Sequence, residues 1–210
     1  MKADTSINAS KWSFGACVAF IALLALLHIV KSEIDPSWNF ISEYQIGRLG
    51  WLMHIAFFSL SLSCIFLSIS LWKPLNFVGK IGIIMLLISA AGMLIAAIFK
   101  TDPLNTPPEF VTQSGKLHQF GAMLDLIPFA ALFITLSILK KMEWHINRLL
   151  LLSSLVLIWF GFIYFVVSMA TQFPVDGKFG PNILLGWQNR IMIITQVLWL
   201  AIISRQVANK

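Results

Sequence analysis

The sequence predicts an all-α integral membrane protein with a bundle of six transmembrane helices. Of the 210 residues, 58% are hydrophobic and only 11% are charged, whereas soluble domains carry about a quarter charged residues. The apolar residues fall into six separate runs, each close to the ~20 residues that cross a ~30 Å hydrocarbon core as a helix. Strands with open edges cannot replace these helices, because unpaired backbone groups in lipid cost several kcal/mol each. We therefore expect a single transmembrane domain over residues 1–210.

The expected helices follow the apolar runs in order. The first, about 12–30, is longer than a typical signal-peptide core and no A-x-A cleavage pattern follows it, so we interpret it as a retained helix. The others are expected at about 43–72, 77–99, 117–139, 149–170 and 183–205. The second begins before its apolar run because Ser42 and Gln45 fit a capping box. In the fourth, Pro128 is expected to weaken the backbone hydrogen bonds.

The distribution of Lys and Arg predicts the orientation. Nine of these residues lie at the N-terminus, in the turns 73–80 and 140–148, and at the C-terminus. Six lie in the longer segments around 31–50, 100–116 and 172–190. Cytoplasmic segments carry the excess of Lys and Arg, so both termini are expected in the cytoplasm of a protein that crosses the cell (plasma or inner) membrane several times. The net charge of +6 forms no compact patch, which disfavours nucleic acid as a partner.

Polar residues gather where the second and fourth runs begin. In "NFISEYQIGRLGW" (39–51), an unbroken helix from Glu43 would align Glu43, Gly47, Gly50 and His54 in one stripe. In the fourth run, His118 and Asp125 are seven residues apart, so they share a face about 10 Å apart along the axis. An ionised carboxylate within the membrane costs at least ~2.5 kcal/mol unless it is paired or hydrated. Asp125 is therefore the most informative single residue.

The sixth run opens with "GWQNR", in which Arg190 is the expected partner of Asp125 or Glu43. We expect the polar residues at these helix entrances to line one pocket on the outer side. Its predicted residues are Ser42, Glu43, Tyr44, His54, Asp102, His118, Asp125, Gln188 and Arg190. Helix N-termini favour anionic groups, so a lipid with a phosphate or carboxylate headgroup is the expected guest. Membrane lipids are the expected partners, no cofactor is required by any motif, and the oligomeric state stays open.

Three functional hypotheses remain open. The first is an amphiphile-binding pocket, and the second is an outer-facing hydrolase or transferase with Glu43, Asp102 and His118 as candidate catalytic residues. In a metal-dependent version, Glu43, His54 and His118 are the candidate ligands, although no H-E-x-x-H or C-x-x-C motif is present. The third is an accessory subunit without chemistry of its own, which predicts a satisfied polar network and no cavity. Ser42 fits a helix cap better than a nucleophile, because no G-x-S-x-G surrounds it.

These residues also carry a resemblance to a known family. The segments "SEYQIGRLGW", "FKTDP", "TQSGKLH" and "GWQNR", in this order and spacing, resemble a bacterial and archaeal membrane family catalogued as domain of unknown function 998. The resemblance covers nearly the whole chain. It implies six helices and draws attention to Ser42, Glu43, Asp102, His118 and Arg190, but the name implies no activity. The arrangement is also loosely similar to six-helix eukaryotic membrane proteins involved in lipid remodelling, which is an association rather than a physical argument.

Overall fold

The computed structural model describes residues 2–141, 146–174 and 178–209, with side chains from residue 5 onward. Its elements are α1 (Lys2–Val30), η1 (Ile41–Gln45), α2 (Trp51–Trp72), α3 (Phe77–Ile98), η2 (Pro108–Phe110), α4 (Gln113–Met123), α5 (Ile127–Leu139), α6 (Arg148–Gln172) and α7 (Leu185–Ala208), where η denotes a 3₁₀ helix. Six helical spans in the described residues are long and apolar enough to cross a membrane, with α4 and α5 forming one of them. The predicted six-helix membrane architecture is confirmed.

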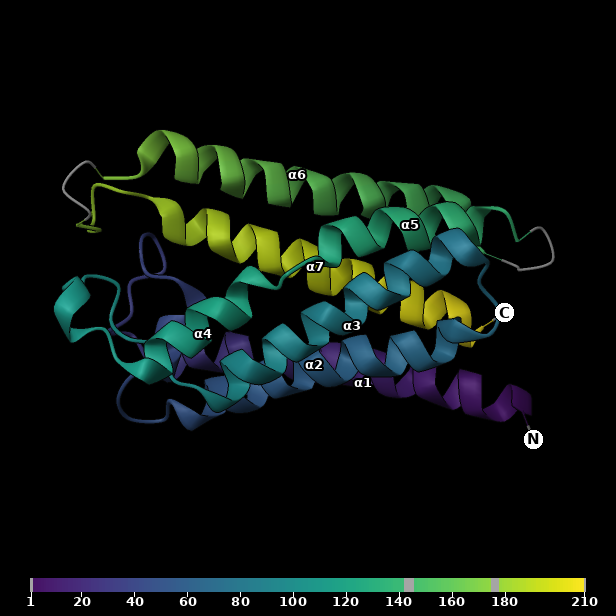
Figure 1. Ribbon diagram of the computed structural model, residues 1–210, viewed down its shortest axis with the longest axis horizontal. Coiled ribbons are helices and arrows are strands. Elements are labelled where there is room, and N and C mark those ends of the chain that lie inside the picture. Colours follow the sequence, from purple (N-terminus) through teal and green to yellow (C-terminus); the bar gives the residue numbers. More distant parts are fainter. Residues whose placement is uncertain (1, 142–145, 175–177, 210) are drawn as a thin grey trace.

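The helices form an elongated bundle in which both termini lie at the same end (Figure 1). Helix α1 packs against α2 and α7, α3 packs against α2, α4 and α5, and α6 packs against α7 and α5. We call the end with both termini the terminal end. The opposite end, which carries the segments 31–50, 99–112, 173–174 and 178–184, is called the loop end (Figure 1). That the terminal end faces the cytoplasm stays a prediction.

The interior of the bundle and its outer surface are both rich in apolar side chains. Leu60, Leu86 and Leu200 are fully buried, whereas Val156 and Phe160 on α6 are more than half exposed, as expected when the surrounding solvent is lipid. Helices in lipid associate through close packing and interhelical hydrogen bonds rather than through the hydrophobic effect. The serines between α1 and α2 serve this purpose: the Ser13 hydroxyl, for example, donates to the Ser63 carbonyl at 2.9 Å.

The helix predicted from residue 43 does not begin there. The segment Ile41–Gln45 is instead a separate 3₁₀ helix, and Phe40 rather than Ser42 occupies its N-cap position. The Glu43 carboxylate accepts a hydrogen bond from the Phe40 backbone N–H at 3.3 Å. The prediction of a cap at Ser42 is therefore wrong. The carboxylate of the next residue, Glu43, accepts the free backbone N–H at the start of this helix instead.

A turn separates this short helix from α2, which begins at Trp51. Gly47 and Leu49 have positive φ angles of 74° and 62°, values that a continuing right-handed helix cannot contain. Gly50 lies so close to the Gln45 carbonyl that a Cβ at this position would overlap it. The stripe predicted along one unbroken helix does not exist, because a turn with positive φ angles separates the two helices.

The fourth span is interrupted between Met123, the last residue of α4, and Ile127, the first of α5. Two backbone N–H groups freed by the break find side-chain acceptors: Leu126 donates to Ser89 Oγ at 2.8 Å, and Ile127 donates to Asp125 Oδ1 at 3.2 Å. Pro128 lies in the first turn of α5, where its missing N–H breaks no helical bond. The sequence predicted weakened backbone hydrogen bonds near Pro128, and the structure shows a complete break of the helix there.

Candidate functional site

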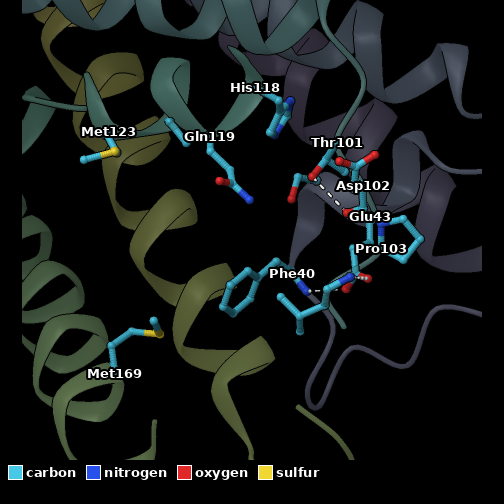
Figure 2. A pocket seen from close by; sticks show the side chains of 12 residues that line it. Phe40, Glu43, Thr101, Asp102, Pro103, His118, Gln119, Met123 and Met169 are labelled. Carbon is cyan, nitrogen blue, oxygen red and sulfur yellow. Dashed lines mark hydrogen bonds between the residues drawn. The ribbon is translucent and has the colours of Figure 1, made fainter. Parts of the chain in front are cut away.

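A cavity of 430 Å³ lies at the loop end, between α4, the segment that follows α3, and α6. Its lining residues are Phe40, Ser42, Glu43, Thr101, Asp102, Pro103, Leu104, His118, Gln119, Ala122, Met123 and Met169. Figure 2 shows that the lining is divided, with Glu43, Thr101 and Asp102 on one side and Met123 and Met169 on the other. The cavity is therefore polar on one wall and apolar on the opposite wall.

A second cavity of 180 Å³ adjoins the first and shares Phe40, Ser42, His118 and Ala122 with it. It leads deeper into the bundle, toward Asp125, and its other lining residues come mostly from α3, α6 and α7. Helix α4 packs on α3 but makes no extensive contact with α6 or α7. We call the two cavities together the groove; it separates α4 from α6 and α7.

Glu43 is the most deeply buried carboxylate of the groove, with 5% of its surface exposed. Oε1 accepts from the Leu104 backbone N–H at 3.0 Å, and Oε2 accepts from Asn39 Nδ2 at 2.7 Å as well as from the Phe40 N–H. Among the described residues the sole ion pair joins Lys31 to Glu33, at 3.3 Å. Glu43 is thus held by neutral donors, and its negative charge has no cationic partner there.

Asp102 organises the start of α4. Its Oδ2 accepts from the Thr112 backbone N–H at 2.8 Å and its Oδ1 from the Thr112 hydroxyl at 2.9 Å. Thr112 is the N-cap of α4 and accepts from the Gly115 N–H. Position 115 requires glycine because a Cβ would overlap Asp102 Oδ2. The helix N-terminus predicted to attract an anionic guest is therefore already occupied by a carboxylate of the chain itself.

His118 lies between the two cavities and is 4% exposed. Its Nδ1 is 2.9 Å from the Phe99 carbonyl oxygen. Because a carbonyl can only accept, the proton must be on Nδ1, and Nε2 of the neutral ring carries the lone pair. The ring also packs edge-on against Phe57, with centroids 5.8 Å apart.

Arg190 is buried outside the groove, with 2% of its surface exposed. Its Nη1 donates to the carbonyls of Asn39 at 2.6 Å and Gly186 at 3.1 Å, and Nη2 donates to the Tyr44 hydroxyl at 3.2 Å. Its Nε donates to His28 Nε2 at 2.9 Å. We call Arg190, His28, Tyr44 and these two carbonyls the Arg190 cluster. The guanidinium is surrounded by neutral acceptors.

The ion pair predicted between Arg190 and either Asp125 or Glu43 is absent from the described residues. His28 takes the place of the carboxylate. Its Nδ1 donates to the Leu24 carbonyl at 2.7 Å, which leaves Nε2 as the acceptor that Arg190 uses. Glu43 is linked to Arg190 indirectly, because Asn39 donates its side-chain amide to Glu43 and offers its carbonyl to Arg190.

His54 and Gln188, two further predicted pocket residues, also lie apart from the groove's lining. His54 Nδ1 donates to the Ala97 carbonyl at 2.7 Å. Next to it, Gln45 Nε2 donates to the Ala96 carbonyl at 2.7 Å, and Gln45 Oε1 accepts from the Thr101 N–H at 3.0 Å. These bonds tie the loop end to the last turn of α3. Of the predicted residues, Ser42, Glu43, Asp102, His118 and Asp125 line the groove, whereas Tyr44, His54, Gln188 and Arg190 do not.

The arrangement gives little support to the metal-dependent hypothesis. No group of three His, Cys, Asp or Glu side chains within the described residues is placed to hold a metal. Glu43 and His54 each bond to different backbone groups, and the Asp102 carboxylate is committed to Thr112. General-base chemistry often requires a third group, such as a carboxylate, that orients the histidine. Among the described residues, no carboxylate pairs with His118. The groove itself differs from the packed interior expected of an accessory subunit.

Sequence reasoning missed several residues that shape the loop end. Lys31 is 1% exposed and donates to the Ile46 carbonyl and to the Arg48 carbonyl at 3.2 Å, which holds the turn before α2. Asp35 accepts from the hydroxyl and backbone N–H of Ser37, and these bonds hold its pKa below the ordinary value. Backbone carbonyls as partners of Lys and Arg leave no pattern in a sequence, so no signal could have identified Lys31.

Comparison with known proteins gives one finding about the family. A family model described as a protein of unknown function (DUF998) matches residues 14–206, a range that includes every residue lining the groove. No curated protein and no solved structure matches the chain. The description of the family carries no activity, so a function has to be argued from the groove itself.

Proposed function

We propose that this chain, which belongs to the DUF998 family of proteins of unknown function, binds a membrane amphiphile in the groove. The polar head would lie against Glu43, Thr101 and Asp102, and the apolar part would lie against Met123 and Met169. The observation that carries the proposal is the division of one 430 Å³ cavity into a polar and an apolar wall. Its volume is within the range of ~300–1,000 Å³ found for small-molecule sites.

The charges that line the groove favour a particular class of head. Glu43, Asp102 and Asp125 are among its lining residues, and no Lys or Arg is. A carboxylate repels an anion strongly where water is scarce, because the Coulomb energy rises as the effective dielectric constant falls. We therefore propose a neutral or cationic head rich in hydrogen-bond donors, such as an amine or a polyol. This replaces the phosphate or carboxylate head expected from the helix N-termini.

The apolar wall offers a route for a hydrocarbon chain toward the bilayer. Met123 is 80% exposed and Phe120 is 53% exposed on α4, in a span long and apolar enough to lie in lipid. Methionine is flexible and polarizable, so it adapts to ligands of varied shape. A chain leaving the groove between α4 and α6 would pass Met123 and Met169 on its way to the lipid.

Native mass spectrometry of protein extracted in a mild detergent tests the proposal. Wild type should retain a lipid, and Ala122→Phe should lose it, because Ala122 lines both cavities and a phenyl ring there would fill the groove. Ala22→Phe is the matched control: Ala22 lines an apolar surface hollow between α1 and α7. It adds the same ring at a distant site, and the lipid should remain bound.

Two further variants examine the head. Glu43→Gln and His118→Ala should each reduce lipid retention. Fragmentation of the lipid retained by wild type identifies the class of its head. Retention of the same lipid by wild type, Ala122→Phe and Glu43→Gln alike would place the lipid outside the groove and refute the proposal. An exclusively anionic head would refute the argument from the lining charges.

A further inference from the structure

The break in the fourth span contains a carboxylate whose surroundings differ from those of an ordinary helix cap. Asp125 Oδ1 accepts a hydrogen bond from the Ile127 N–H at the start of α5. This one bond would be enough for a residue that only caps the helix. Its Oδ2, however, accepts from Gln196 Nε2 at 2.8 Å, across the bundle on α7. Within the described residues Asp125 has no cationic partner, so a negative charge on this carboxylate would be uncompensated inside the span.

Gln196 adds a second, independent observation. The residue is fully buried, and its Oε1 is one of two buried side-chain oxygens in the described part of the chain without a hydrogen-bond partner. Buried acceptors without a partner are rare in native proteins and call for an explanation. Here the unpartnered oxygen belongs to the same amide that contacts the carboxylate. Nε2 of Gln196 donates to the carboxylate, whereas the oxygen of the same amide has neither a donor nor a cation.

The other unpartnered oxygen, Gln188 Oε1, provides a comparison on the same helix. Gln188 is also buried, at 5% exposure, but among the described residues it has no hydrogen bond to an acidic side chain. Taken by itself, the unpartnered oxygen of either glutamine could be explained by a missing hydrogen-bond donor. Gln196, unlike Gln188, lies beside a carboxylate. We therefore infer that the missing partner of the Gln196 oxygen is a cation rather than a neutral donor.

We propose that Asp125 and Gln196 form a binding site for a small monovalent cation, with sodium as the ion to test. One positive charge neutralises the one carboxylate, and a turn of the Gln196 amide about its Cγ–Cδ bond would exchange Nε2 for Oε1 beside Asp125. Oε1 would then supply a second hard oxygen ligand of the kind that such ions prefer. Carboxylates and freed carbonyls at interrupted transmembrane helices are a recurrent way of coordinating Na⁺ or H⁺. The site lies at the deep end of the same groove, but it is argued from Asp125 and Gln196 alone and does not depend on the amphiphile proposal.

The structure gives the ion a way in from the loop end. Asp125 lines the deeper cavity of the groove, which adjoins the cavity lined by Glu43 and Asp102, so acidic side chains mark the route. Toward the terminal end the way is closed. Trp199, three residues after Gln196 on α7, is fully buried and donates to Thr135 Oγ1 at 3.3 Å. The site would thus exchange its ion with the loop end alone in this conformation.

Thermal unfolding of the purified full chain in detergent tests the proposal. Melting temperatures are compared in the chlorides of Na⁺, K⁺ and N-methyl-D-glucamine at constant ionic strength. Binding to the folded state alone stabilises it in proportion to the logarithm of the ion concentration. Wild type should show a rise that grows with the logarithm of the Na⁺ concentration and reaches about 5 °C at a hundredfold excess over the dissociation constant, with none in N-methyl-D-glucamine.

Three variants make the result specific. Asp125→Asn keeps an acceptor for the Ile127 N–H but lacks the charge, and Gln196→Leu lacks the amide oxygen; both should lose the sodium-dependent rise. Gln188→Leu, the matched control, should retain it. Equal melting temperatures of wild type in all three salts would overturn the proposal, as would an undiminished sodium effect in Asp125→Asn. If a variant unfolds on purification, ²³Na NMR line broadening by wild type, and its absence in the other variant, decides the question.

Discussion

The Arg190 cluster and the groove lie at the same end of the molecule and meet at Asn39, yet they differ in what their polar groups contact. In the cluster, Arg190 donates to carbonyls, a hydroxyl and an imidazole, so its hydrogen-bonding groups are met by the protein itself. In the groove, Glu43 and Asp102 also accept hydrogen bonds from the protein, but they line a cavity, and no cation among the described residues pairs with them. Buried charge alone therefore does not mark a binding site; a packed cluster stabilises the fold, whereas a lined cavity can accept a ligand.

Replacing Arg190 should have the largest effect on stability. Arg190→Met would leave the Asn39 carbonyl, the Tyr44 hydroxyl and His28 without their shared donor. Each buried group that loses its partner costs about 1–3 kcal/mol, so we expect a loss of roughly 3 kcal/mol or more and a fall in melting temperature of about 10 °C. Thermal unfolding in detergent measures it.

Arg205→Met is the matched control for Arg190. Arg205 is exposed near the terminal end and lies over the Phe14 ring, 5.8 Å from its centroid. An exposed cation–π contact contributes about 0.5–1 kcal/mol, so its loss should shift the melting temperature far less. Similar shifts for both variants would show that the Arg190 cluster is not a stabilising element.

A methyl group added at Gly115 should have an intermediate effect. The Cβ of Gly115→Ala would overlap Asp102 Oδ2 and force it away from Thr112. Overpacking of this kind costs about 1–3 kcal/mol. Gly15→Ala is the control, since nothing lies within 4 Å of a Cβ at that position in α1, and its stability should be unchanged or slightly raised. Equal stability of the two variants would contradict the role assigned to Asp102 at the wall of the groove.

The smallest effect is expected at Ser42. It lines both cavities but does not occupy the N-cap position, which belongs to Phe40. Ser42→Ala should therefore change the free energy of unfolding by less than about 0.5 kcal/mol. Thr112→Ala, which removes a true N-cap of α4, should cost about 1 kcal/mol. A larger loss at Ser42 than at Thr112 would restore the capping role that the sequence pattern indicated.

The spans could be predicted from the sequence because apolar runs of membrane-crossing length have few other physical solutions. The break near Pro128 was partly foreseen, since proline disrupts a helix at a definite place. The start of α2 was not. Positive φ angles at Gly47 and Leu49 place a turn there, and a leucine in that conformation has no signature in the sequence.

The same limit applies to the candidate site. Residues at the entrances of neighbouring spans could be expected to lie near one another, and five of them do line the groove. The partner of Arg190 could not be predicted, because charge pairing suggested a carboxylate while the fold supplies carbonyls and His28. The contact between Gln196 and Asp125 could not be predicted either, because it depends on how α7 is rotated against the break.

The interrupted fourth span also bears on how the chain is made. Its polar groups need partners as soon as the span leaves the insertion machinery, since an acidic residue at the centre of a helix costs about 2.5–3.5 kcal/mol on insertion. The preceding helix, α3, offers Ser89 to the Leu126 N–H, and Gly92 and Gly121 let the two backbones touch. These two helices can therefore enter the bilayer as a pair. Asp125 meets Gln196 only when α7, which follows α3, α4 and α5 in the chain, has been synthesised, so this contact forms later than the pairing of α3 with α4.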